Sequence, residues 1–247
     1  MDLSRPWKVV GHIACLLLSL SVILPMLLVL GTSLKPDNEI YGANPFPVVP
    51  TFKNYAEILG NSEYLWFFRN SVINSVLRVA GQLAICVLTA YAFARFQFRG
   101  RETIFFILLG AMMIPSQLTV IPNYMLMADL EWFDTFQGLI VPNLAAPFGA
   151  FLLRQHMLAF PGELLDSAEI DGAGHWKALW LIVVPNLRPA LAALTIVLFI
   201  ESWNEYFWPL MITETSATQT IQIGLRRFLQ DEMGDRFGPL MAAVSLA

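Results

Sequence analysis

Long uninterrupted runs of apolar residues dominate the chain and predict helices that cross a membrane. The first run covers 9–30 and contains no charged residue. Further runs follow at 70–93, 103–124, 136–153 and 189–208. A helix of about 20 residues spans the ~30 Å hydrocarbon core of a bilayer. Each run is therefore predicted to form one transmembrane helix.

A last apolar stretch at 238–247 is too short to complete another crossing. Its ten residues would reach only ~15 Å as a helix. We therefore expect six transmembrane helices, with the sixth truncated in this sequence.

The composition agrees with a membrane protein. Of 247 residues, 56% are hydrophobic and 14% are charged, and the mean hydropathy is +0.59. Soluble domains are typically ~45–50% apolar and ~25% charged. The predicted fold class is therefore an all-α integral membrane protein. The 15 Lys and Arg form no basic patch, so no nucleic acid partner is expected.

Cysteine and histidine usage gives no indication of metal or redox chemistry. Cys15 and Cys86 both lie inside apolar runs, where a thiol packs as a small apolar side chain. The three histidines are scattered and lack ligand spacing. We expect no metal site and no catalytic residue.

Two short links predict the orientation in the membrane. The link at 94–102 carries Arg95, Arg99 and Arg101, whereas the link at 127–134 carries neither Lys nor Arg. Because cytoplasmic loops are enriched in cations, the first link is expected inside the cell. This orientation places the N-terminus in the cytoplasm.

An acidic segment interrupts the apolar pattern between the fourth and fifth runs. It reads GELLDSAEIDGAGHWKALWLIVVP and covers 162–185. Pro161 favours a helix start, and the acids that follow suit the positive end of the helix dipole. Asp171 and Gly172 form a helix-stop signal. The pattern predicts a short helix, a glycine turn and a second amphipathic segment at 175–184.

Two interpretations of this segment remain open from the pattern alone. The small residues Ala168, Gly172 and Ala173 would let another protein approach the backbone closely, which favours a docking surface. Alternatively, the segment is a solvated connector between two membrane helices.

Charged residues inside predicted spans are costly and indicate function. Arg78 lies in the second run, and Glu201 and Glu205 lie four apart in the fifth, which predicts that they share one helical face. These residues, with Trp203 and Asn204 between them, are predicted to line a translocation path or to form a gate, in which Arg78 pairs with Glu201. For Glu205, contact with water at the membrane interface is the alternative.

The acidic segment resembles the cytoplasmic signature loop of ABC-importer permease subunits. That loop reads Glu-Ala-Ala, three residues, Gly, and about a dozen residues to Pro. The matching positions here are Asp166-Ser167-Ala168, Gly172 and Pro185. The departure to Asp-Ser-Ala keeps an acid followed by two small residues, so the docking role is expected to persist.

Further stretches extend the resemblance over nearly the whole chain. They are similar to the carbohydrate-importer branch, which includes the second maltose-type and the glycerol-3-phosphate-type permeases. The stretches are NSVINSV, LTAYAFARFQFRGR, MMIPSQLTVIPNY, FDTFQGLIVP, ESWNEYFWPL and TIQIGLRRF.

The resemblance implies the type I ABC importer permease fold in a bacterial cytoplasmic (inner) membrane. It divides the chain into 1–69, with the first transmembrane helix and an extracytoplasmic loop, and a permease core at 70–247 with a coupling loop at 159–184. In this family the loop sits in a cleft of the ATPase subunit and transmits its movement, so that the membrane helices alternate access. The residues given this coupling role are Glu163, Leu164, Asp166, Ser167, Ala168, Asp171, Gly172, Ala173 and Pro185.

The implied partners are a sister permease, two ATP-binding cassette subunits and an extracytoplasmic solute-binding protein, in a lipid bilayer. None of the four lysines is followed by Ser or Thr, so the chain has no phosphate-binding loop. ATP and Mg are therefore expected on the partner ATPase. The expected substrate is a sugar or a sugar-like polyol phosphate.

The residues do not favour two other function classes. An ion-gradient-driven secondary transporter would predict internal repeats with midplane ion ligands, and no repeat is visible. A membrane enzyme would need a nucleophile–base pair, a metal set or a cofactor motif, and none is apparent.

Overall fold

The computed structural model describes residues 5–230 and 237–247. All regular secondary structure in these two ranges is helical. The chain divides into two compact units, one made of Met1–Phe68 and Ile221–Ala247 and the other of Arg69–Thr220. We call them unit 1 and unit 2. Helix α3 (Ser62–Arg95) begins in unit 1 and continues through unit 2.

Unit 1 joins the two ends of the chain. It contains α1 (Arg5–Ser33), α2 (Lys53–Gly60), α13 (Ile221–Gln230) and α14 (Phe237–Leu246). Helix α14 packs against α1 and α2. Asn54 Nδ2 donates to the carbonyls of Ser33 and Lys35 at 2.8 and 2.9 Å, and Tyr64 Oη donates to the Ala243 carbonyl at 3.2 Å. These bonds attach α2 and the start of α3 to their neighbours.

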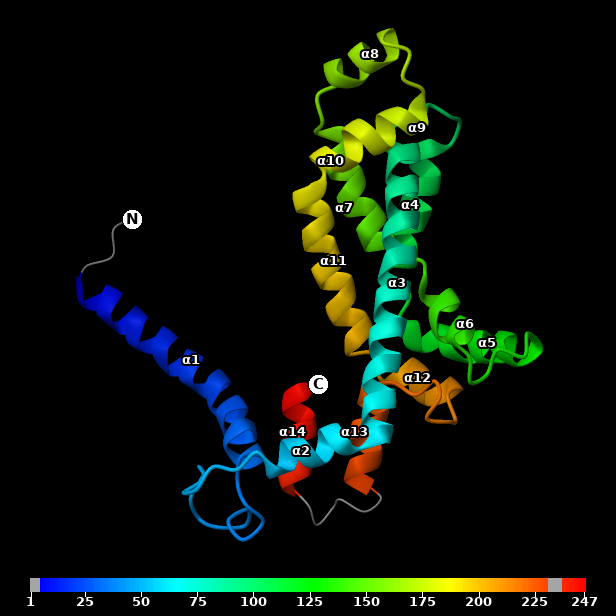
Figure 1. Ribbon diagram of the computed structural model, residues 1–247. Helices are drawn as coiled ribbons and strands as arrows, with labels where there is room; N and C mark the ends of the chain where they lie inside the picture. Colours follow the sequence, from blue (N-terminus) through cyan, green and yellow to red (C-terminus); the bar gives the residue numbers. More distant parts are fainter. Residues whose placement is uncertain (1–4, 231–236) are drawn as a thin grey trace. The chain divides into compact units, whose positions relative to one another are not determined.

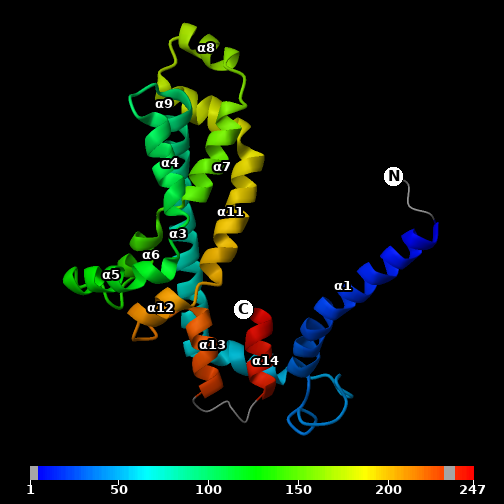
Figure 2. The same ribbon diagram turned by 180° about the vertical axis from the view of Figure 1, so that it is seen from behind.

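Unit 2 is a bundle of long helices capped by shorter ones (Figures 1 and 2). Its elements after α3 are α4 (Arg101–Ala111), α5 (Ser116–Asp129), α6 (Phe136–Ile140), η1 (Val141–Asn143), α7 (Pro147–Leu158), α8 (Glu163–Ile170), α9 (His175–Ala178), η2 (Leu179–Val183), α10 (Val184–Asn186), α11 (Arg188–Trp203) and α12 (Phe207–Ile212). In both views α3, α4, α7 and α11 run alongside one another, and α8 lies beyond α9 at one end of unit 2.

The core of unit 2 forms where α3, α7 and α11 meet. Leu153 of α7 and Leu194 of α11 are completely buried, as is Cys86 of α3. Gly149 allows a close approach, because an added Cβ would lie 2.7 Å from Cys86 Sγ and 3.1 Å from Leu194 Cδ2. The apolar runs therefore bury one side of each helix against the others.

The first two predicted transmembrane helices are confirmed. The run at 9–30 lies within α1, whose apolar side chains are exposed, and the run at 70–93 lies within α3, which begins earlier, at Ser62. Among the described residues, these two helices are long and apolar enough to cross a membrane. Two further pairs of helices, each bent at a short break, also qualify if each pair is counted as one span, which gives up to four spans.

None of the other three runs forms one continuous helix, although two of them belong to bent helix pairs that each still qualify as one span. The run at 103–124 is divided between α4 and α5, with Pro115 just before α5. The run at 136–153 bends by 47° between η1 and α7, and α7 continues to Leu158. The run at 189–208 ends at Trp203, and α12 follows separately. Prolines cause much of this difference, since they remove a backbone donor and interrupt a helix.

Candidate functional site

The acidic segment folds as a short helix with a defined stop. Glu163 and Asp166 lie in the first turn of α8. At its end, the Ala173 amide donates to the Ala168 carbonyl at 2.8 Å, and the Gly172 amide donates to the Glu169 carbonyl at 3.0 Å. This pair of bonds is a Schellman motif, which needs a left-handed residue. Gly172 supplies it with φ +76°.

The predicted apolar face of α8 is present but only partly covered. Ala168 is buried and Leu165 packs at the edge of the unit 2 core. In contrast, Leu164 is 47% exposed and Ile170 is 86% exposed. Trp176, the second residue of α9, is 65% exposed. Helix α8 therefore presents apolar side chains that unit 2 itself does not bury.

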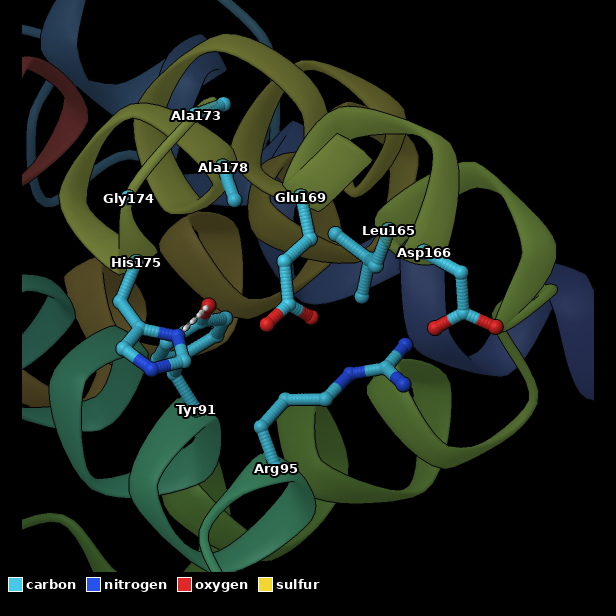
Figure 3. Close-up of a pocket in the computed structure, with 9 residues that line it drawn as sticks. All are labelled: Tyr91, Arg95, Leu165, Asp166, Glu169, Ala173, Gly174, His175 and Ala178. Atoms are coloured by element: carbon cyan, nitrogen blue, oxygen red, sulfur yellow. Dashed lines mark hydrogen bonds between the residues drawn. The ribbon is translucent and has the colours of Figure 1, made fainter. Parts of the chain in front are cut away.

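A polar pocket of about 300 Å³ lies between α8 and the end of α3 (Figure 3). Its lining residues are Tyr91, Arg95, Leu165, Asp166, Glu169, Ala173, Gly174, His175 and Ala178. The side chains of Asp166 and Glu169 extend from α8 toward Arg95. Neither carboxylate forms a salt bridge with Arg95 in the described part of the chain. The pocket thus separates the acids of α8 from the nearest cation.

Aromatic contacts position the other side of this pocket, where α9 meets the end of α3. Tyr91 Oη lies 3.5 Å from His175 Nδ1, and the His175 ring packs edge-on against Phe96 at 4.9 Å. These contacts fix α9 on the end of α3, so α8 and the glycine turn are the parts that project.

A charged cluster that the sequence analysis missed joins α3, α4 and α7. Arg154 is buried, and its Nη2 donates to both carboxylate oxygens of Glu102 at 2.7 and 2.9 Å. Its Nε donates to the Phe93 carbonyl at 3.3 Å, and its guanidinium lies 4.1 Å from the centre of the Phe105 ring. No local spacing indicates this cluster, because its members come from separate helices.

The buried face of α3 is largely polar from Asn70 to Gln82. Six side chains at helical spacing form what we call the polar stripe. They are Asn70, Ser71, Asn74, Ser75, Arg78 and Gln82, and all are buried. Asn70 Nδ2 donates to the carbonyls of Ser216 and Gln219 at 3.0 and 3.1 Å, and Gln82 Nε2 donates to the Asn143 carbonyl at 2.8 Å.

Arg78, the predicted charge in the second run, belongs to this stripe. The carboxylates of Glu201 and Glu205 lie within electrostatic reach of it. No salt bridge within 4.0 Å joins either of them to Arg78 in the described ranges. A direct Arg78–Glu201 pair is therefore not formed in this structure.

The prediction that Glu201 and Glu205 share a helical face is wrong. Helix α11 ends at Trp203, and the Asn204 side chain donates to the Ile200 carbonyl at 2.8 Å at that end. Glu205 instead lies two residues before α12, and its Oε1 accepts from the amides of Phe207 and Trp208 at 3.1 and 3.2 Å. Capping of α12 thus explains Glu205.

Asp134 was another unanticipated residue. It lies in the loop before α6, and its carboxylate accepts bonds from the Glu214 and Thr215 amides at 3.1 and 3.2 Å and from the Thr215 and Thr218 hydroxyls. Desolvation raises the pKa of Asp134, but these hydrogen bonds outweigh it and hold the pKa below its ordinary value. Ionised Asp134 therefore links the loop before α6 to the loop after α12 through these hydrogen bonds.

Comparison with known proteins identifies the family. Residues 82–247 match the family described as "Binding-protein-dependent transport system inner membrane component". The sn-glycerol-3-phosphate transport system permease protein UgpE of Rhizobium meliloti is 32% identical, over 90% of this chain and 82% of that protein. The arabinooligosaccharides transport system permease protein AraQ of Bacillus subtilis is 33% identical, over 87% of this chain and 78% of that protein.

A solved structure shares the fold. A chain of a bacterial ABC transporter involved in the import of alginate aligns with a TM-score of 0.89 at 23% identity, over 100% of this chain and 94% of that chain. The expectation of a type I importer permease fold is confirmed.

The alternative of a secondary transporter driven by an ion gradient is overturned by these matches, since the relatives are permeases of ABC importers. The chain belongs to the family of binding-protein-dependent transport system inner membrane components, as a permease subunit of an ATP-driven importer and not as an enzyme.

Proposed function

We propose that this permease imports a sugar or a sugar-like polyol phosphate by alternating access, coupled to ATP through the loop at 159–184. The named substrates of the relatives support the substrate class: glycerol 3-phosphate, arabinooligosaccharides and alginate are all polyhydroxylated. The division into 1–69 and a permease core at 70–247 is part of this proposal.

The exposed apolar surface of α8 is the observation that carries the coupling assignment. Isolated exposed apolar residues are common on proteins. Here Leu164 and Ile170 lie on one eight-residue helix that projects from the end of unit 2 and carries acids in its first turn. A helix of this length is marginal alone, so a partner that covers it would also stabilise it.

The proposed partners follow from this arrangement. Two ATP-binding cassette subunits would hold ATP and Mg²⁺, and one of them would receive α8. A sister permease would complete the pore, and a solute-binding protein would deliver the substrate on the opposite side. The second solved neighbour, a bacterial alginate transporter in complex with a substrate-bound periplasmic protein, supports the last partner. With α8 in the cytoplasm, the N-terminus is also cytoplasmic and the protein is multi-pass.

A contribution of Glu201, Trp203 and Asn204 to the translocation path is also proposed. Glu201 is exposed on α11, and Trp203 stacks on Phe199 at 5.6 Å between centroids. Arg78 would act from behind this surface, because its side chain is buried.

Co-purification tests the coupling assignment. We expect Ile170→Asp to leave the permease in the membrane but to release the ATPase subunit from a tagged complex, because a charge would replace the most exposed apolar side chain of α8. The same variant is expected to lose stimulation of ATP hydrolysis by the loaded binding protein. Unchanged recovery of the ATPase with Ile170→Asp would contradict the assignment.

A pair of glycines tests whether the shape of the turn matters. Gly172 and Gly162 both have open space around the position of a Cβ, but only Gly172 has a positive φ. Gly172→Ala should therefore strain the turn by about 1–2 kcal/mol and reduce coupled uptake, whereas Gly162→Ala should leave uptake unchanged. Equal uptake by the two variants would show that the Schellman turn is dispensable for coupling.

A further inference from the structure

Eight of the nine buried side-chain atoms without a hydrogen-bond partner among the described residues lie on the polar stripe, at Ser202 or at 219–220, and the ninth is Arg95 Nε at the C-terminal end of α3. Five buried atoms of the polar stripe have no hydrogen-bond partner among the described residues. They are Asn70 Oδ1, Asn74 Oδ1, Ser75 Oγ, Arg78 Nε and Gln82 Oε1. Three further buried atoms also have no hydrogen-bond partner among the described residues: Ser202 Oγ, Gln219 Oε1 and Thr220 Oγ1.

The second group of atoms faces the first. The Gln219 carbonyl accepts from Asn70, which places Gln219 and Thr220 beside the start of the polar stripe. Helices α3 and α11 run alongside in opposite directions, so the last turn of α11, which contains Ser202, lies toward the end of unit 2 where its part of α3 begins (Figures 1 and 2). The five atoms of the polar stripe lie at helical spacing along α3, and 219–220 adjoin its first residue, so we call this row of atoms the column.

Leaving such a column unsatisfied is energetically costly. A buried donor or acceptor without a partner costs about 1–3 kcal/mol in proteins, and a membrane offers no solvent to compensate. Buried polar atoms in native proteins are almost always paired, and internal water is their usual partner when the chain supplies none.

The chemistry of the column selects water over an ion. Four of the eight unpartnered atoms are amide oxygens, which only accept hydrogen bonds and repel an anion, whereas the three hydroxyls can both donate and accept. The Arg78 guanidinium disfavours a metal cation, and in the described ranges no group of three His, Cys, Asp or Glu side chains could hold one. Water both accepts from Arg78 Nε and donates to the oxygens.

We infer that the polar stripe, together with Ser202, Gln219 and Thr220, binds a column of ordered water molecules inside unit 2. This column hydrates Arg78. It keeps a guanidinium charged within a membrane helix without a direct salt bridge.

Radiolytic labelling of thiols tests this inference in the assembled transporter. Hydroxyl radicals made by an X-ray pulse from bound water oxidise side chains next to that water. Ser75→Cys places a thiol in the column at a fully buried position, and the native Cys86 is an equally buried thiol on the same helix. We expect the thiol introduced by Ser75→Cys to be oxidised several-fold faster than Cys86. Equal rates would overturn the inference.

Two controls separate bound water from an open aqueous channel. Ala217→Cys, in the exposed loop after α12, is the water-exposed reference and should react with a water-soluble maleimide. The thiol introduced by Ser75→Cys should not react with the maleimide, because ordered water does not admit a bulky reagent. Alkylation at position 75 would indicate an open channel and would count against a bound column.

Thermal stability gives a second readout, because a hydrated column and a dry column predict opposite changes in Tm for the same substitution. If the column is hydrated, Asn74→Leu displaces water from its other partners and lowers the Tm. If the column is dry, the same change removes an unsatisfied oxygen and raises the Tm. Val76→Leu, at a half-exposed position of α3, is the matched control and should leave the Tm unchanged. A raised or unchanged Tm for Asn74→Leu would overturn the inference.

Discussion

Two parts of the buried face of α3 pack through different interactions. Toward its C-terminus, Cys86, Val87, Ala90 and Tyr91 pack in the apolar core of unit 2. Nearer its N-terminus, the polar stripe faces the loop at 213–220. Both parts are equally hidden from solvent. They differ in their partners: apolar side chains of the protein fill the contacts at the C-terminal part, whereas several polar atoms of the stripe have no partner in the described part of the chain.

This difference separates a rigid region from an adjustable one. Close apolar packing has few alternatives, because shifting a helix opens cavities or creates clashes. Contacts completed by water can be remade in several geometries at little cost. An importer that alternates its access needs both a fixed part and a part that can be repacked. We infer that the apolar end of α3 is the fixed part.

The largest expected effect is at the apolar end. Leu194→Ala should lower the free energy of unfolding by about 3–5 kcal/mol, because it opens a cavity at a completely buried position. Denaturant unfolding in detergent micelles measures this loss. Leu181→Ala, at a position 72% exposed, is the control and should cost far less. Similar losses at the two positions would remove the evidence for a tightly packed apolar end.

A smaller effect is expected in the polar stripe. Asn70→Leu should cost about 2 kcal/mol, since it removes the donor to two carbonyls, those of Ser216 and Gln219. The same unfolding experiment measures it, with Val72→Leu as the control on the same helix. If Asn70→Leu were no more destabilising than its control, these two bonds would contribute nothing to the stability of the polar end.

The smallest effect concerns the loops beside the polar stripe. Asp134→Asn should cost about 1 kcal/mol at neutral pH, because a neutral amide accepts weaker hydrogen bonds than a carboxylate. The native pKa of Asp134 is lowered, so its contribution is present above the ordinary value of about 4 and is lost as the pH falls through the native pKa.

The pH dependence of this variant provides the check. The difference in Tm between the native chain and Asp134→Asn should be full at neutral pH and should vanish in strong acid. Glu131→Gln, in the same loop, is the control. A difference in Tm that persists unchanged into acid would show that the charge of Asp134 is not the cause.

Local sequence patterns predicted the presence of the helices better than the residues at which the helices end. The stop of α8 at Gly172 could be anticipated, because a Schellman turn depends on one left-handed residue and a few neighbouring bonds. The end of α11 at Trp203 could not, because the apolar run continues past it to Trp208. Glu201 and Glu205 consequently appeared to share a face, whereas Glu205 caps a separate helix.

The sequence by itself determined the class of protein, the membrane helices α1 and α3, the acidic helix with its glycine stop, and the family, since each of these depends on composition or on residues close together in the chain. Only the tertiary structure decided which polar residues meet. The Arg154–Glu102 pair, the Asp134 bonds and the column beside Arg78 join separate elements. Their partners are chosen by the packing of whole helices, which no local spacing records.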